Sequence, residues 1–208
     1  VPMITTLITA IVTLLILGPI GTVIGNWLGD FFKWLENFGP WVVPTIVGAT
    51  FPLMVTTGTH YGLVSIGINN RMTIGYDTIA QPGALASNVA QGGATLAAMF
   101  CAKDKKMKSI AVSSGISALL GITEPAMFGV NLKMKYPFYA AMFGSAVGCA
   151  YVTLTNVQNI SPGAAGIIGF VCIKSGGMLN YMIGILISLV VGFVVTMALS
   201  KHPKFKEV

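Results

Sequence analysis

The sequence predicts an all-α integral membrane protein with about four transmembrane helices, two re-entrant helical hairpins and one interfacial amphipathic helix. Of its 208 residues, 54% are hydrophobic and only 9% are charged, whereas soluble domains have about 25% charged residues. The 25 glycines and 10 prolines lie inside the apolar runs, as they often do in transmembrane helices. The few charged residues gather in short clusters between those runs. This composition leaves too little polar surface for a water-soluble globular fold.

The N-terminal segment predicts one crossing followed by a helix on the membrane surface. Residues 1–28 carry no charge, and this length exceeds the roughly 20 helical residues that cross a hydrocarbon core. We place the first span at residues 3–25. In residues 27–38, large apolar side chains recur at helical spacing opposite charged ones, which predicts the interfacial helix.

Residues 39–70 predict the first re-entrant hairpin. The segment is apolar, but prolines and glycines interrupt it, and a polar group of threonines with His60 lies in it. A proline in a helix interior costs about 3 kcal/mol, so a smooth helix is not expected. Broken backbone at membrane depth is tolerated only where protein or a water-filled cavity covers it.

Residues 79–101 predict another span, although Gln81, Asn88 and Gln91 make it less apolar. Residues 103–108 follow and hold four of the twelve basic residues of the chain. Basic clusters next to transmembrane segments mark the cytoplasmic side. We therefore expect this cluster to be cytoplasmic.

Residues 109–131 predict the second hairpin, because basic residues flank this apolar stretch on both sides. It contains Glu124 followed by Pro125. Since proline disfavours the helical conformation of the preceding residue, we expect an extended Glu124 and a helix break there.

Residues 138–157 and 181–200 predict the last two spans, joined by a glycine-rich, irregular connection at 158–180 and followed by a basic cytoplasmic tail at 201–208. Counting crossings back from this tail makes the two hairpins enter from opposite faces. Discontinuous helices of this kind often hold substrates near the membrane midplane. The patterns Gly21-x-x-x-Gly25 and Gly144-x-x-x-Gly148 indicate close helix packing.

Glu124 is the first candidate for a functional residue, because it is the only acidic residue well inside an apolar segment. An intramembrane carboxylate is costly to bury and is a functional-site hypothesis by default. A carboxylate at a helix break can bind a polar ligand. The alternative is a structural carboxylate paired with a neighbouring Lys or Arg.

His60 is the second candidate, as the only histidine in an apolar segment. A lone histidine of this kind is often a satisfied core residue, and that alternative stays open. An imidazole can donate or accept hydrogen bonds, and a carboxylate can accept two from hydroxyl groups. Together His60 and Glu124 suit a polyhydroxylated ligand. Neither has a second ligand at metal-binding spacing, so we expect no metal and no cofactor.

Several segments resemble a known family. Gly121-Ile-Thr-Glu-Pro-Ala-Met-Phe-Gly-Val-Asn131, with residues 133–138, resembles the signature of the membrane-embedded IIC subunit (EIIC) of the bacterial phosphoenolpyruvate-dependent sugar phosphotransferase system, glucose superfamily. Thr57-Gly-Thr-His-Tyr-Gly-Leu63 is similar to its Gly-x-His motif. Residues 75–78, 91–94 and 103–108 resemble its glucoside branch, which includes permeases for β-glucosides, trehalose and sucrose. The resemblance covers about residues 1–200.

The resemblance implies an elevator-type sugar permease in the bacterial inner (plasma) membrane, crossing it several times. Residues 1–200 would form its substrate-binding transport half. His60 and Glu124 would be catalytic and would contact the sugar, with Glu124 near the 6-hydroxyl that becomes phosphorylated. Thr59 and Thr123 would complete the sugar contacts.

The resemblance also implies partners: a glucoside or disaccharide substrate, the phosphorylating subunit or domain EIIB, an N-terminal EIIC scaffold half absent from this chain, a second copy in a homodimer, and membrane lipids. Cys101, Cys149 and Cys172 lack the sequence context of the EIIB phosphocysteine. We therefore expect that this chain cannot phosphorylate sugar by itself, although it would belong to a sugar phosphotransferase complex.

Two other functions remain open from the sequence. Glu124 and His60 could bind protons or ions in a secondary sugar transporter. The chain could also be a truncated, sensor-like EIIC fragment. The basic excess does not predict nucleic-acid binding, because the lysines lie between apolar segments and not along one polar face.

Overall fold

The computed structural model describes residues 2–17, 19, 23, 34–35, 37–39, 41–163 and 166–205. The chain divides into two compact units, residues 1–39 and 40–208. In the described residues every regular element is a helix, and two isolated β-bridges occur, from Asn159 to Asp77 and to Ile173. The prediction of an all-α chain is therefore confirmed for this part of the sequence.

The first unit contains one described helical run. α1 (Pro2–Val12) continues into the π-helical turn η1 (Thr13–Leu17), which agrees with a helix at the start of the first predicted span. The rest of that span and most of the predicted interfacial helix at 27–38 lie outside the described residues, as does the Gly21-x-x-x-Gly25 pattern.

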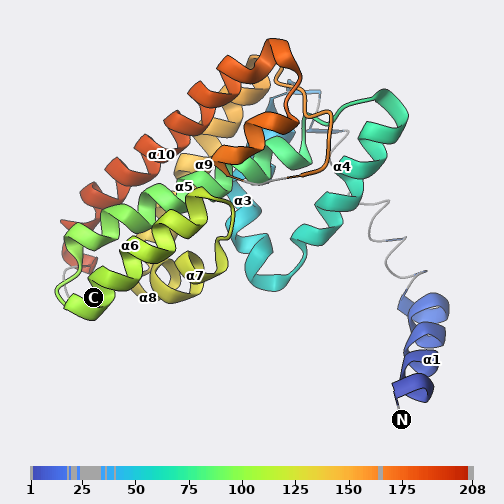
Figure 1. Cartoon of the computed structure of the whole chain (residues 1–208), viewed down its shortest axis with the longest axis horizontal. Coiled ribbons are helices and arrows are strands. Elements are labelled where there is room, and N and C mark those ends of the chain that lie inside the picture. The colour runs from blue at the N-terminus through green and yellow to red at the C-terminus, as the bar shows by residue number, and fades with distance from the viewer. Residues whose placement is uncertain are drawn as a thin grey trace. The chain divides into compact units, whose positions relative to one another are not determined.

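The second unit is a helical bundle (Figure 1). Its helices are α3 (Val42–Thr57), α4 (His60–Ile74), α5 (Ala80–Cys101), α6 (Lys105–Leu119), α7 (Glu124–Ala126), the π-helical turn η2 (Met127–Asn131), α8 (Leu132–Met134), α9 (Tyr136–Leu154), the 3-10 helices η3 (Ile167–Cys172) and η4 (Ser175–Gly177), α10 (Met178–Ser200) and the 3-10 turn η5 (Pro203–Phe205). α5 lies at the centre, because α3, α6, α9 and α10 all pack on it.

Among the described residues, two helices are long and apolar enough to cross a membrane: α9, and α10 together with η4 (Ser175–Ser200). They coincide with the last two predicted spans. The helix α5 matches the predicted span at 79–101 in position, but its polar residues lower its hydropathy. Since 16 of its 22 residues are buried inside the unit, protein rather than lipid surrounds most of α5.

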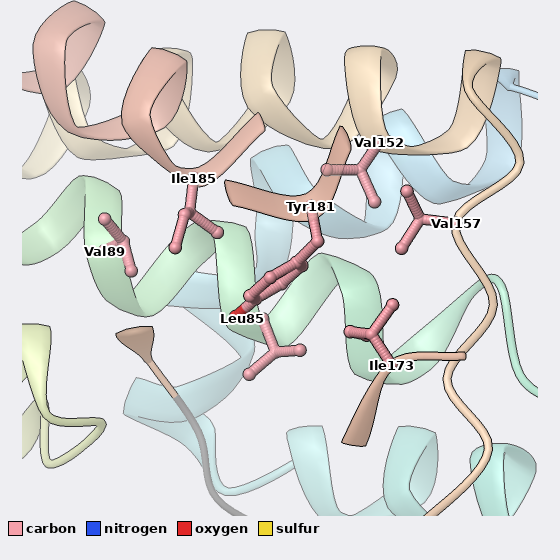
Figure 2. Packing of buried hydrophobic residues seen from close by; sticks show 7 residues of the cluster. All are labelled: Leu85, Val89, Val152, Val157, Ile173, Tyr181 and Ile185. Carbon is pink, nitrogen blue, oxygen red and sulfur yellow. The ribbon is translucent and has the colours of Figure 1, made fainter. Parts of the chain in front are cut away.

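The core of this unit is built around Tyr181 of α10, which is fully buried. Leu85, Val152 and Ile173 from three other segments pack around its ring, as Figure 2 shows. The Tyr181 hydroxyl donates a hydrogen bond of 2.7 Å to the Gly166 carbonyl. This bond ties the connection at 158–180 to α10 without leaving a buried hydroxyl unpaired.

The helices α9 and α10 approach each other closely through Gly144 and Gly148. A Cβ atom at Gly144 would lie only 2.8 Å from the Ser188 carbonyl oxygen, and a Cβ at Gly148 would overlap the Ser188 side chain. Small residues at such a contact let two backbones pack closely where lipid gives no hydrophobic drive for association. The predicted packing role of Gly144-x-x-x-Gly148 is therefore confirmed.

The prediction that prolines break the helix in residues 39–70 is wrong at Pro52. The helix α3 continues through it. Pro52 lacks the N–H that would bond to the Gly48 carbonyl four residues earlier, and the Ser145 hydroxyl of α9 donates to that carbonyl instead, at 2.6 Å. Tertiary packing thus replaces the lost helical hydrogen bond, and the chain turns only at Gly58.

Candidate functional site

The first candidate segment is the turn between α3 and α4, where the two helices splay apart as the arms of a V (Figure 1). α3 ends at Gly58, whose φ of 76° lies in the left-handed region that glycine favours. The hydroxyl oxygens of Thr57 and Thr59 are 2.9 Å apart, and the Thr59 hydroxyl also donates to the Met54 carbonyl at 3.3 Å. These bonds fix the turn that presents His60, the first residue of α4.

The His60 imidazole is half-buried between two aromatic rings. Its ring centroid lies 4.2 Å from that of Tyr61 and 6.0 Å from that of Phe51. Its Nδ1 atom is buried and has no hydrogen-bond partner in the described part of the chain. A buried imidazole nitrogen without a partner retains the capacity to bind a polar group.

The second candidate segment follows α6. The chain leaves this helix through Gly121, with φ 105°, and the Ile122 N–H donates to the Ser117 carbonyl at 3.0 Å. Thr123 is buried, and Glu124 is the first residue of α7.

The prediction of an extended Glu124 is wrong, because this residue is helical and the break lies just before it. Pro125 stands in the first turn of α7, where a helix needs no N–H from it and where its fixed φ suits the helix. The break is therefore displaced by a few residues and not abolished.

The Glu124 side chain is exposed. No ion pair or hydrogen bond engages its carboxylate among the residues that the structure describes, where the ion pair found joins Arg71 to Asp77. The alternative of a structural carboxylate held by a neighbouring Lys or Arg thus has no support in this part of the chain. Glu124 is free to accept hydrogen bonds from a ligand.

The candidate residues form two pairs, and the structure shows no direct contact between the pairs in the described residues. His60 follows Thr59 in one turn, and Glu124 follows Thr123 in another. Within the described ranges, no hydrogen bond, ion pair or ring contact links the first pair to the second. What they share is α5, because both α4 and α7 pack on this helix.

A polar cluster at the far end of α4 was not anticipated. Asp77 is fully buried and accepts hydrogen bonds from Asn70 and from the backbone N–H groups of Ile79, Ala80 and Gln81, at 2.7–3.2 Å. Arg71 lies 3.8 Å from the Asp77 carboxylate. Asp77 thus caps the start of α5 and also binds α4 through Asn70.

The connection after α9 also joins this cluster. Arg71 donates to the Asn159 side-chain oxygen at 3.0 Å, and the backbones of Asp77 and Asn159 exchange two hydrogen bonds. The sequence contains a signal for part of this arrangement, because Asp77 lies three residues before the first residue of an apolar helix, where a carboxylate can accept from the first backbone N–H groups. The contact with Asn159 has no local signal.

The basic segments gather at the opposite end of α5. Buried Ala98, Ala111 and Tyr136 pack in one cluster with Phe205 of the C-terminal tail. This packing brings the segments 103–108, 133–135 and 201–205 to one end of the bundle, and Lys105, Lys133, Lys135 and Lys201 are exposed there. α5 separates this end from the Asp77 cluster by about 30 Å.

A second polar group missed from the sequence lies in the middle of α5. Ser87, Gln91 and Thr95 are fully buried and recur every four residues, on one helix face. The Thr95 hydroxyl lies 2.8 Å from the side-chain oxygen of Asn131 in η2. The spacing within α5 is visible in the sequence, but its partner is not.

No group of three or more His, Cys, Asp or Glu side chains that could hold a metal ion is found in the described residues. The polar chemistry of both candidate turns consists of hydroxyl, imidazole and carboxylate groups. These groups suit hydrogen bonds to a neutral polar ligand.

Comparison with known proteins gives one family match. Residues 1–145 match the sequence model of the family described as "Phosphotransferase system, EIIC". This range includes both candidate turns.

Curated relatives match nearly the whole chain. The sucrose-specific EIIBC component of Staphylococcus xylosus is 43% identical over 192 residues, which cover 89% of this chain and 40% of the relative. The sucrose-specific EIIBC component of Pasteurella multocida is 39% identical over 99% of this chain and 44% of its own length. The beta-glucoside-specific EIIBCA component of Bacillus subtilis is 37% identical over 84% of this chain and 29% of its own length.

The chain therefore spans less than half the length of these relatives. No solved structure gives a significant match.

Proposed function

Because this chain belongs to the EIIC family of the phosphotransferase system, we propose that it is the sugar-binding part of a permease that carries a glucoside or disaccharide inward while EIIB phosphorylates it. The observation that carries this proposal is the similarity to sucrose-specific and beta-glucoside-specific components over 84–99% of the chain. Sucrose and β-glucosides are accordingly the first substrates to test.

Glu124 and His60 are the proposed sugar contacts. The exposed Glu124 carboxylate can accept hydrogen bonds from two sugar hydroxyl groups, and charge-assisted bonds of this kind are the stronger ones. The buried Nδ1 of His60, which has no partner among the described residues, can bind a third polar group. Thr59 and Thr123 stand directly before these residues and would complete the contacts from each turn.

The chemical step requires correct placement more than reactive groups from this chain. The phosphoryl group would pass in line from the EIIB cysteine to a sugar hydroxyl. Glu124 would orient that hydroxyl and accept its proton. His60 would hold the sugar on the other side, so that the hydroxyl faces the incoming phosphoryl group.

We place residues 1–200 in the transport half of EIIC, with 201–208 as a cytoplasmic tail. An N-terminal scaffold half and a second copy would complete the permease. The arrangement has four spans, two re-entrant hairpins formed around the turns at Gly58 and Gly121, and an interfacial helix at 27–38, in the inner (plasma) membrane. The splayed α3–α4 turn and the break before α7 support hairpins at these places.

The basic end of the bundle is the proposed docking face for EIIB. Exposed lysines from segments 103–108 and 133–135 lie there together, on the side that the positive-inside rule makes cytoplasmic. A cysteine introduced by Lys105→Cys should react only with reagents that reach the cytoplasm, and one introduced by Met72→Cys only with external reagents. Labelling of both positions from the same side would contradict this arrangement.

The proposed activity is tested with the assembled permease in membrane vesicles, with EIIB, its phosphoryl-donating proteins and phosphoenolpyruvate present. Labelled sucrose, trehalose and aryl β-glucosides are supplied in turn. We expect one of them to accumulate as its phosphate, only when phosphoenolpyruvate is present. Accumulation of the unmodified sugar driven by an ion gradient would instead establish a secondary transporter.

A further inference from the structure

The segment that carries Glu124 contains a helical irregularity. After α7 the chain forms the π-helical turn η2, in which the Leu132 N–H bonds to the Met127 carbonyl five residues earlier. A π-helical turn holds one residue more than an α-helical turn. Such turns are rare, and they are frequent at functional sites.

The extra residue changes which side chains face outward. Seven residues make almost two turns of an α-helix, so Glu124 and Asn131 would share one face if the segment were regular. In the structure Glu124 is exposed whereas Asn131 is fully buried. One inserted residue rotates the remainder of the helix by roughly a quarter turn, which accounts for this difference.

Asn131 is held in its buried position by the centre of the bundle. Its side-chain oxygen lies 2.8 Å from the Thr95 hydroxyl, and that hydroxyl lies 2.7 Å from the Gln91 carbonyl oxygen. A hydroxyl has one proton and so donates to one of these acceptors at a time. The Asn131 Nδ2 atom has no hydrogen-bond partner in the described residues. If the Asn131 amide is flipped, so that its oxygen and nitrogen atoms exchange places, Nδ2 can donate to the Thr95 hydroxyl while that hydroxyl donates to the Gln91 carbonyl.

From these observations we propose that Thr95 and Asn131 are positioning residues that lock the π-helical turn and thereby keep Glu124 facing its ligand. If this bond is lost, the segment can relax to a regular helix. Glu124 and Asn131 would then return to a common face, and because Asn131 lies in the core, the carboxylate would turn inward. This inference rests on the proposed role of Glu124 in sugar binding.

The test separates the lock from the sugar site by using two readouts. In the assembled permease, a thiol introduced by Glu124→Cys is labelled with a maleimide without sugar, and the labelling of the parent protein is subtracted. Sugar affinity is measured separately in proteins that keep Glu124. Both readouts are taken with Thr95 intact, with Thr95→Val and with Thr95→Ser.

Thr196→Val is the matched control. Thr196 is also fully buried, and its hydroxyl donates to the carbonyl four residues earlier at 2.7 Å, as Thr95 does. It lies in α10, and in the described part of the chain its hydroxyl makes no bond to η2. It therefore reports the loss of a buried threonine hydroxyl without the proposed lock.

We expect Thr95→Val to lower both the labelling rate and the sugar affinity by up to roughly tenfold, the range that one hydrogen bond gives. Thr95→Ser keeps the hydroxyl and should leave the labelling rate and the sugar affinity near those of the parent protein. Thr196→Val should change neither quantity. If labelling falls and affinity does not, the lock is supported and the sugar role of Glu124 is wrong. If labelling is unchanged, or if Thr196→Val lowers it equally, the lock is overturned.

A second variant covers the case in which Thr95→Val does not fold. Thr95→Val combined with Asn131→Leu removes both polar partners, so no buried amide is left unpaired. This protein should fold and should still label slowly after Glu124→Cys. Normal labelling in it would overturn the proposal.

Discussion

Two carboxylates in the second unit have opposite surroundings. Asp77 is fully buried, accepts hydrogen bonds from three backbone N–H groups at the start of α5 and lies beside Arg71. Glu124 is exposed, and no polar contact engages it within the described part of the chain. The hydrogen-bonding capacity of Asp77 is used by groups of the fold, whereas the Glu124 carboxylate remains available to a ligand. The two carboxylates therefore differ in whether the fold already supplies hydrogen-bond partners for them.

The largest effect is expected for Asp77→Ala. This change leaves the buried Arg71 charge without its carboxylate partner, and it removes the acceptor of three backbone N–H groups at the start of α5. Breaking a buried pair from one side costs about 3–5 kcal/mol, so the free energy of unfolding should fall by this amount. Thermal unfolding of the purified permease in detergent measures it. A stability equal to that of the parent protein would contradict the role assigned to Asp77.

A smaller effect, on binding and not on stability, is expected for Glu124→Gln. The change keeps the shape and one acceptor but removes the charge. Since hydrogen bonds to charged groups contribute about 1.5–3 kcal/mol, sugar affinity should fall by roughly ten- to a hundredfold. Equilibrium binding measures the affinity, with thermal unfolding as the control for folding. Parent affinity in the folded variant would remove Glu124 from the sugar site.

The double variant Glu124→Gln with His60→Ala tests whether the two residues bind the same region of the sugar. If both residues bind the same region of the sugar, the double variant should lose less affinity than the sum of the two single losses, by about 1 kcal/mol. The same binding assay gives all four affinities of the cycle. Additive losses would mean that the two turns contact separate parts of the ligand or that one of them does not bind it.

The smallest effect is expected for Asp104→Ala. Asp104 caps α6 by accepting from the Lys106 and Met107 N–H groups at 3.2–3.3 Å, but it is exposed. Water can replace these bonds, so the loss should be about 0.5–1 kcal/mol. The same unfolding measurement compares it with Asp77→Ala. Equal losses at the two positions would show that burial does not distinguish the two caps.

The predicted elements agree best with the structure where the periodicity of apolar residues is long and uninterrupted. The helices α9 and α10 lie within three residues of the predicted spans at 138–157 and 181–200. The agreement is poorer at prolines. A proline removes one hydrogen bond locally, but whether the helix breaks depends on what else can donate to the freed carbonyl. At Pro52 that donor is Ser145, which is 93 positions away along the chain.

The all-α class, the last two spans, the family and the two turns that carry His60 and Glu124 can be predicted from the sequence alone. These follow from composition, from short-range periodicity and from motifs of contiguous residues. Three features are visible only in the folded chain: Asp77 is buried and bound to α4, Asn159 joins it, and η2 turns Asn131 inward toward Thr95. Each of these depends on side chains that meet across helices, and a buried polar group is stable only with the partner that the fold brings to it.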